Sequence, residues 1–173
     1  TLDQLLGGRM VINIISSELP GEVLPSAPRY RRTLEHMHAL RTLLDGAPLA
    51  AAGEFVNVSV DAPRVRTVSR RSPPLYFGGL SDDAREVAAA AADVYLMWPD
   101  TMQGVAAIID DMRARAAHHG RTLRFGYRVH VVVRETESAA RAAAQHLVAA
   151  LDPEVGDAIR ARSLDSQSVG VRA

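Results

Sequence analysis

The sequence predicts an α/β fold in which helices cover a parallel sheet, and three observations support this. Four short, mostly apolar runs lie at residues 9–16, 73–79, 93–98 and 123–133. Each run is followed by a stretch with helical features, so strand and helix alternate four times. Such alternation is typical of a parallel sheet, either doubly wound or closed into a (β/α)8 barrel. Because a barrel takes about 250 residues, four units in 173 residues amount to about half of one.

The first unit combines a buried strand with an amphipathic helix. Residues 9–16 are rich in Val and Ile and follow two glycines, which favours a strand covered on both faces. A helix over residues 28–45 is predicted because apolar residues recur three and four positions apart; they are Tyr30, Leu34, Met37, Leu40 and Leu44. Gly46 ends this helix.

The later units have helix-start and helix-stop signals at the expected places. Ser81 begins an Ala-rich helix that reaches about residue 92, and Thr136 begins one that reaches about residue 151. The intervening helix, residues 100–119, ends at Gly120. Residues 53–71 interrupt the pattern, and one or two short strands are expected there. We therefore expect residues 1–173 to be a single partial barrel domain, with the remaining strands outside this chain.

Composition excludes several classes of function. The formal net charge is +0 and the chain has no cysteine, which argues against nonspecific nucleic-acid binding, disulfides and cysteine-ligated zinc. No apolar run approaches the ~20 residues that span a bilayer, and a reducing cytoplasm is the expected location. No P-loop, GxSxG or GxGxxG motif is present. We predict no metal site, because the histidines form no ligand constellation.

Arg128 and His130 are the strongest candidates for chemistry. They are two residues apart in the predicted strand 123–133, so both side chains point to the same face. In a barrel the outer face lies under helices, so this polar face is expected to line the lumen. The alternative is that Arg128 pairs with an inward carboxylate and His130 is a hydrogen-bonded core histidine.

Two further features are weaker candidates. The turn at Gly78, Gly79, Leu80 and Ser81 precedes a helix N-terminus and is suited to holding a phosphate. The alternative is a tight turn in which Ser81 only caps the helix. Trp98 ends the third strand, where its indole is placed either to wall a ring-shaped ligand or to pack.

Four stretches resemble the bacterial luciferase-like superfamily of flavin-dependent monooxygenases, and are closest to the alkanesulfonate monooxygenases. In chain order they are TLDQLLGGRMVINIISS, PPLYFGGLSD, DVYLMWPD and HGRTLRFGYRVHVVVRETE. The resemblance implies a (β/α)8 barrel of which this chain supplies about strands four to seven. It also implies reduced FMN from a separate NAD(P)H-dependent reductase, O2 as co-substrate, and oxygenation of a small organosulfur compound that releases sulfite and an aldehyde. A homodimer or homotetramer is expected.

The resemblance also implies roles for individual residues. Tyr30, Gly79 and Ser81 would contact the FMN phosphate, and Asn13 would lie beside the flavin ring. Trp98 would line the substrate pocket, and the catalytic residues would be Arg128 and His130. Arg128 is suited to holding an anion such as the sulfonate, and His130 to moving a proton near neutral pH.

The sequence departs from the family pattern at two positions near the phosphate. Ser26 replaces a histidine often found four residues before the tyrosine, and Leu80 replaces a serine often found after the paired glycines. Other possibilities are a related oxidoreductase that uses FMN or F420 on another substrate, and a degenerate flavin-binding or assembly protein without catalysis.

Overall fold

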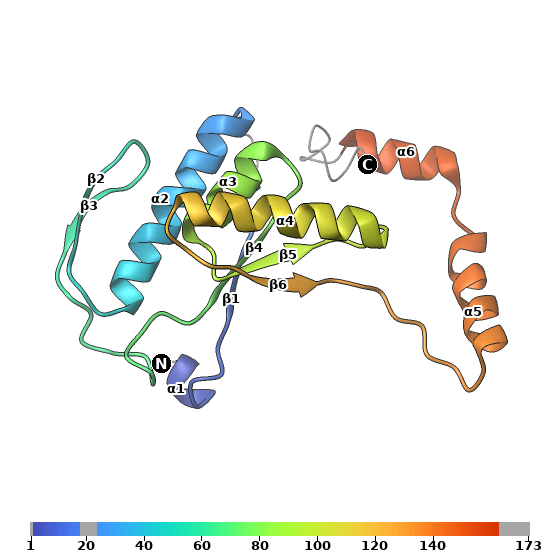
Figure 1. The fold of residues 1–173 in the computed structure, drawn as a ribbon, viewed down its shortest axis with the longest axis horizontal. Helices are drawn as coiled ribbons and strands as arrows, with labels where there is room; N and C mark the ends of the chain where they lie inside the picture. Colours follow the sequence, from blue (N-terminus) through green and yellow to red (C-terminus); the bar gives the residue numbers. More distant parts are fainter. Residues whose placement is uncertain (1, 18–23, 163–173) are drawn as a thin grey trace.

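The computed structural model describes residues 2–17 and 24–162, and its centre is a parallel sheet covered on one face (Figure 1). In spatial order the strands are β1 (Ile12–Ile14), β4 (Leu75–Gly78), β5 (Val94–Met97) and β6 (Arg124–Tyr127). The helices between them, α2 (Ser26–Leu44), α3 (Asp82–Ala91) and α4 (Met102–His118), lie on the same side of the sheet. A doubly wound sheet has helices on both faces, whereas a barrel has them only outside. The arrangement is that of a barrel wall.

The core lies between the sheet and the three helices. Phe77 on β4 and Tyr95 on β5 are register partners, and both are fully buried against the helices. Burying such a side chain contributes about 1.5–3 kcal/mol. The predicted stripe of α2 is confirmed at four of its five positions, because Met37 is buried and Tyr30, Leu34 and Leu40 pack against the core.

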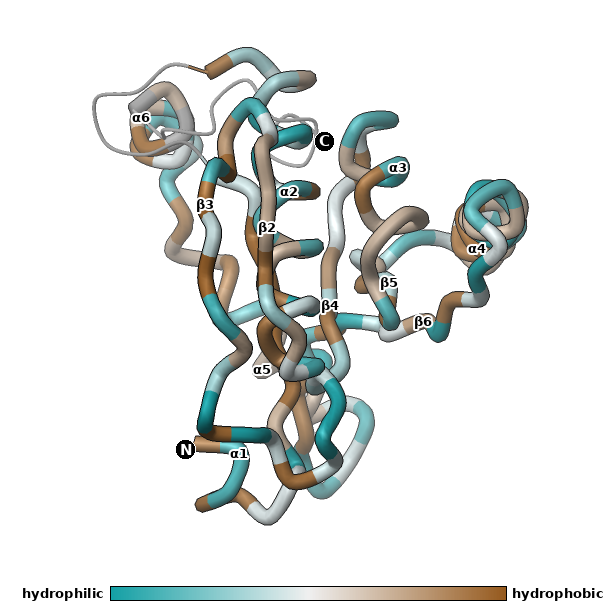
Figure 2. The backbone as a smooth tube through the Cα atoms, turned by 90° about the vertical axis from the view of Figure 1, so that its left-hand side faces the viewer, coloured by the Kyte–Doolittle hydropathy of each residue, from teal (hydrophilic) through white to brown (hydrophobic). Residues whose placement is uncertain are grey.

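An antiparallel hairpin fills the predicted interruption and lies along α2 (Figure 2). It consists of β2 (Leu49–Ala52) and β3 (Asn57–Val60), and so begins a few residues before the range in which strands were expected. The Glu35 carboxylate on α2 accepts hydrogen bonds from the backbone N–H groups of Phe55 (2.9 Å) and Val56 (2.8 Å) in the hairpin turn. These bonds lower the pKa of Glu35.

One carboxylate joins three segments at the amino ends of the strands. Asp93, just before β5, accepts hydrogen bonds on Oδ2 from the Leu75 backbone N–H (2.8 Å) and from Arg41 of α2 (2.8 Å). Arg121, in the connection that follows α4, forms an ion pair with the other oxygen at 3.5 Å. The amino ends of β4 and β5 are thereby tied to the carboxyl end of α2 and the start of the β6 segment.

The fourth predicted strand is shorter than expected. It was predicted over residues 123–133, but β6 ends at Tyr127, with one more backbone bond from Arg128 to Met97 (3.0 Å). Its neighbour β5 ends at Met97, and Pro99 soon follows, so there is no further backbone to pair with. Val131 and Val133 are consequently exposed.

The ends of the described chain contain two helices that were not predicted, α1 (Leu2–Leu5) and α6 (Pro153–Arg162). The predicted helix that begins after Thr136 is present as α5 (Glu137–Ala149), capped by the Thr136 hydroxyl. It lies apart from the sheet in Figure 1, and none of its residues is buried. Within the described ranges, no helix has both the length and the apolar character needed to cross a membrane.

Candidate functional site at the carboxyl ends of the strands

The strand register gives the sheet two different faces. Leu75 and Phe77 of β4 face the helices, so Tyr76 and Gly78 face the open side that would be the barrel lumen. Asn13 is the register partner of Tyr76 and is exposed on this open face. In barrel enzymes the active site lies at the carboxyl ends of the strands. Gly79, Ser81, Trp98 and Arg128 follow the carboxyl ends of β4, β5 and β6, whereas Asn13 lies in the middle of β1.

Tyr30 and Gly79 come together where β4 ends. The Tyr30 ring packs edge-on against Phe77, with 6.4 Å between ring centroids. A Cβ atom added at Gly79 would lie 3.6 Å from the Tyr30 hydroxyl oxygen and 2.5 Å from the Ala84 Cβ. The turn therefore sits so tightly on α3 that only glycine fits, and the Tyr30 hydroxyl borders it.

Ser81 caps helix α3. Its Oγ accepts a hydrogen bond from the Ala84 backbone N–H at 3.3 Å, as the capping interpretation predicted. The hydroxyl proton is still available to an anion, because the serine oxygen acts as an acceptor in the cap. Capping and phosphate binding are thus compatible roles for Ser81.

The two aspartates of the first turn of α3 are held by residues outside that helix. Arg115 of α4 donates to Asp82 at 2.9 Å, and the Ser26 hydroxyl donates to Asp83 at 2.6 Å. Ser26, which replaces the histidine often found in the family, thus contacts the helix that begins at Ser81. Arg115 offsets one of the negative charges that would otherwise repel an anion at this N-terminus.

Trp98 and Arg128 form a second pair at the same edge. The Arg128 guanidinium lies over the indole, 4.7 Å from Cζ to the ring centroid. Within the described ranges Arg128 forms no ion pair, so the expected alternative, pairing with a carboxylate of this chain, is not observed there. His130 follows in the irregular segment beyond β6 and is exposed rather than buried in the core.

The predicted residues thus form two groups on neighbouring strands. Tyr30, Gly79 and Ser81 meet at the start of α3, while Trp98 and Arg128 meet at the ends of β5 and β6. Asn13 lies on β1 and His130 follows β6, so the two residues are on opposite sides of these groups. Among the described interactions, none joins Asn13 or His130 to either group. The hydroxyl of Tyr95 donates a hydrogen bond to the Gly79 carbonyl, but the sequence did not identify Tyr95 as a candidate. The sequence indicated no more than an aromatic residue with a hydroxyl group on the helix-facing side of the strand.

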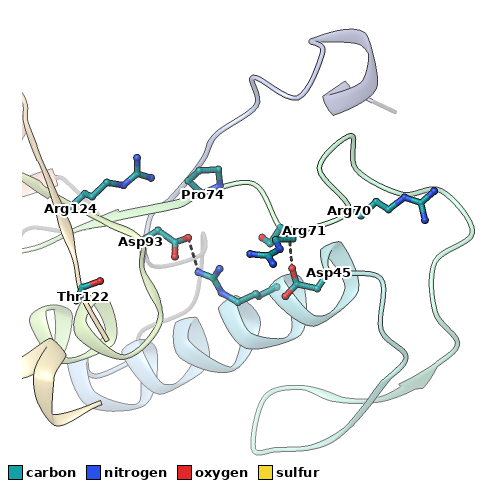
Figure 3. Close-up of a pocket in the computed structure, with 9 residues that line it drawn as sticks. Asp45, Arg70, Arg71, Pro74, Asp93, Thr122 and Arg124 are labelled. Atoms are coloured by element: carbon teal, nitrogen blue, oxygen red, sulfur yellow. Dashed lines mark hydrogen bonds and ion pairs between the residues drawn. The ribbon is translucent and has the colours of Figure 1, made fainter. Parts of the chain in front are cut away.

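A large cavity lies at the opposite edge of the sheet. It has a volume of about 710 Å³ and is lined by residues including Arg41, Asp45, Arg70, Asp93 and Arg124. In Figure 3 the Arg70 side chain points away from the other labelled residues, and both aspartates already accept hydrogen bonds. The guanidinium groups therefore do not converge on one ligand.

Among the described residues, the geometry gives no support to a metal site. In the part of the chain that the structure describes, no three His, Asp or Glu side chains are grouped closely enough to hold a metal ion. The site residues are instead hydroxyls, a guanidinium, an imidazole and aromatic rings. These groups suit an anionic organic cofactor and an anionic substrate.

Comparison with known proteins agrees with this geometry. The profile of the luciferase-like monooxygenase family matches residues 1–170. Sulfoquinovose monooxygenases of Novosphingobium aromaticivorans and Agrobacterium fabrum are 58% and 49% identical over 99% of this chain. These alignments cover 49% and 45% of those proteins, so the chain spans about half the length of the curated relatives it matches.

Solved structures support the fold. A riboflavin lyase crystallised with modified FMN and riboflavin superimposes with a TM-score of 0.80 at 18% identity, over 92% of this chain and 43% of that one. The expected fold, part of a (β/α)8 barrel, is confirmed, and so is the resemblance inferred from the four stretches. The chain belongs to the luciferase-like monooxygenase family.

Proposed function

We propose that the protein carrying this chain is a two-component monooxygenase that uses reduced FMN and O2 to oxygenate a sulfonate, releasing sulfite and an aldehyde. The observation that carries the proposal is the pair of residue groups at one sheet edge. The Tyr30 and Ser81 hydroxyls border a glycine turn at a helix N-terminus, and on the neighbouring strands a guanidinium lies on an indole. The first group suits a phosphate and the second an anionic substrate.

The residues at the start of α3 fit the FMN phosphate. The Tyr30 and Ser81 hydroxyls have protons to donate, and Gly79 lets the backbone approach closely. When bound, reduced flavin supplies the electrons with which O2 is activated. Asn13, on the open face of β1, would lie beside the flavin ring. F420 is the alternative cofactor, and a comparative titration with FMN separates the two.

Arg128 would bind the sulfonate. A guanidinium matches an oxyanion with two parallel N–H donors, and the Trp98 indole restricts where this guanidinium can lie. His130 would hold or move a proton near the reacting carbon, since an imidazole can act as a general acid or base near neutral pH. We propose sulfoquinovose, a sulfonated hexose, as the first substrate to test, because two relatives carry that name; simple alkanesulfonates come second.

Further components follow from the same proposal. An NAD(P)H-dependent flavin reductase would deliver the reduced cofactor, and the enzyme would be a homo-oligomer in the cytoplasm.

The test is sulfite release by the full-length protein supplied with FMN, a flavin reductase and NADH. We expect sulfite in proportion to sulfoquinovose consumed, and a smaller yield or none from alkanesulfonates. Sulfite from alkanesulfonates alone would reverse the order of substrates. Tight flavin binding with no sulfite from any sulfonate would contradict sulfonate oxygenation and favour the scaffold alternative.

A further inference from the structure

Tyr95 lies directly beneath the turn that precedes α3. It belongs to β5, its side chain is 1% exposed, and its hydroxyl donates a hydrogen bond to the Gly79 carbonyl at 2.5 Å. Burial raises the pKa of the Tyr95 phenol, although the nearby Arg85 guanidinium acts in the opposite direction. The phenol therefore remains a proton donor at physiological pH.

A network of ion pairs between α3 and α4 lies beside the Tyr95 hydroxyl. Arg85, whose guanidinium lies against the Tyr95 hydroxyl, donates to Asp111 of α4 at 2.9 Å. Arg115 donates to the other oxygen of Asp111 at 2.9 Å and reaches Asp82 in the first turn of α3, also at 2.9 Å. The hydrogen-bonded network thus connects α4 both to the underside of the turn and to the start of the helix.

The orientation of the turn depends on this support. Gly79 packs so closely on Ala84 that an added Cβ would overlap it, and the Tyr30 hydroxyl borders the same glycine. The Gly79 carbonyl is held from the helix-facing side of the sheet by the hydrogen bond from the Tyr95 hydroxyl. Release of this carbonyl would let the peptide before Leu80 rotate, and the positions of the following N–H groups and of Ser81 would change.

We propose that Tyr95 is a positioning residue for the flavin phosphate: by holding the Gly79 carbonyl, it orients the turn and the Ser81 hydroxyl toward the phosphate. The inference rests on the proposed function, because it takes the ligand at this turn to be FMN. Tyr95 lies on the helix-facing side of the sheet and does not itself touch the cofactor. Its contribution is specific to ligands that carry a phosphate.

The experiment compares Tyr95→Phe with wild type in the full-length protein, using fluorescence titration with FMN and with riboflavin, which lacks the phosphate. One neutral hydrogen bond is worth about a five- to tenfold change in an equilibrium. We expect the Kd for FMN to rise about five- to tenfold while the Kd for riboflavin stays within twofold. Tyr127→Phe is the matched control, because Tyr127 lies on the same face one strand away and its hydroxyl contacts Asp100 instead.

A second measurement needs no flavin. Amide hydrogen exchange at Leu80 and Ser81 in the flavin-free protein should be faster in Tyr95→Phe and unchanged in Tyr127→Phe. Equal loss of FMN and riboflavin affinity, or unchanged exchange at the turn, would overturn the positioning role. Failure of the wild-type protein to bind FMN would instead overturn the proposed function, and the inference with it, even if exchange at the turn responds to Tyr95→Phe.

Discussion

The guanidinium of Arg128 rests on the indole of Trp98, with 4.7 Å between Cζ and the ring centroid. The residues directly follow the neighbouring strands β5 and β6, and the Arg128 backbone N–H donates to the Met97 carbonyl at 3.0 Å, just before Trp98. A cation–π contact at an exposed site contributes about 0.5–1 kcal/mol. That free energy favours the stacked orientation of the Arg128 side chain about two- to fivefold over others, which is enough to orient its guanidinium.

Replacing Trp98 should therefore weaken substrate binding more than flavin binding. We expect Trp98→Ala to raise the KM for the sulfonate substrate at least about threefold, because Arg128 loses the surface that orients it. Trp98→Phe, which retains a ring face, should recover part of the loss. Steady-state kinetics at saturating reduced FMN measures both variants. A KM that is unchanged in Trp98→Ala would show that the stacking does not serve the substrate.

Substitution of Ser81 separates the two roles of its hydroxyl. Glycine at an N-cap costs only a few tenths of a kcal/mol, so Ser81→Gly should leave thermal stability nearly unchanged. The Kd for FMN should nevertheless rise about fivefold or more, because one donor to the phosphate is lost. Thr136→Gly, at the cap of α5, is the matched control and should not alter FMN affinity. Equal FMN affinity in Ser81→Gly and wild type would leave Ser81 with the capping role alone.

Loss of the His130 imidazole should affect turnover rather than cofactor binding. We expect His130→Ala to lower kcat by about 100-fold, the lower range for removal of a general acid or base. FMN affinity should change by less than twofold. His146→Ala on exposed α5 serves as the control. Wild-type turnover in His130→Ala would be incompatible with a proton-transfer role.

The Glu35 contact predicts a pH-dependent hairpin. Hydrogen bonds from Phe55 and Val56 lower the pKa of Glu35, so the carboxylate stabilises the turn above the ordinary glutamate pKa. This stabilisation is lost as the pH falls below the ordinary glutamate pKa and through the lowered value. Amide proton shifts of Phe55 and Val56, followed by NMR, should titrate together with a midpoint below that of a free glutamate. A midpoint at or above the ordinary value contradicts the prediction, and the transition should vanish in Glu35→Ala.

Local signals in the sequence predicted the helices well. Ser81 and Thr136 cap helices where expected, and Gly46 and Gly120 follow helix ends with positive φ angles of 79° and 63°. Each of these residues interacts with backbone only a few positions away, so the sequence around it is enough to predict where the helix begins or ends. The length of a strand cannot be predicted in this way, because β6 ends where its neighbour β5 ends. The periodicity of residues 123–133 does not indicate which strand is the neighbour or where that strand ends.

In the candidate site, too, local features were predictable from the sequence and contacts between strands were not. The alternation that placed Arg128 on the lumen side agrees with the register, since Gly126 pairs with Leu96 on the open face. The stacking of Arg128 on Trp98 and the bond from Tyr95 to Gly79 join residues 30 and 16 positions apart. Both depend on the register between strands, which the sequence patterns did not specify. The roles proposed for all of the candidate site residues remain predictions.

The interactions of the Asp93 carboxylate also determine which segments unfold together. It links the β4 backbone, the last turns of α2 through Arg41, and the segment before β6 through Arg121. These segments cannot separate without breaking a shared ion cluster, so they should open as one cooperative unit with the global unfolding free energy. The hairpin β2–β3 lies outside that cluster, and local opening there should occur at a much lower free energy, leaving the barrel wall intact.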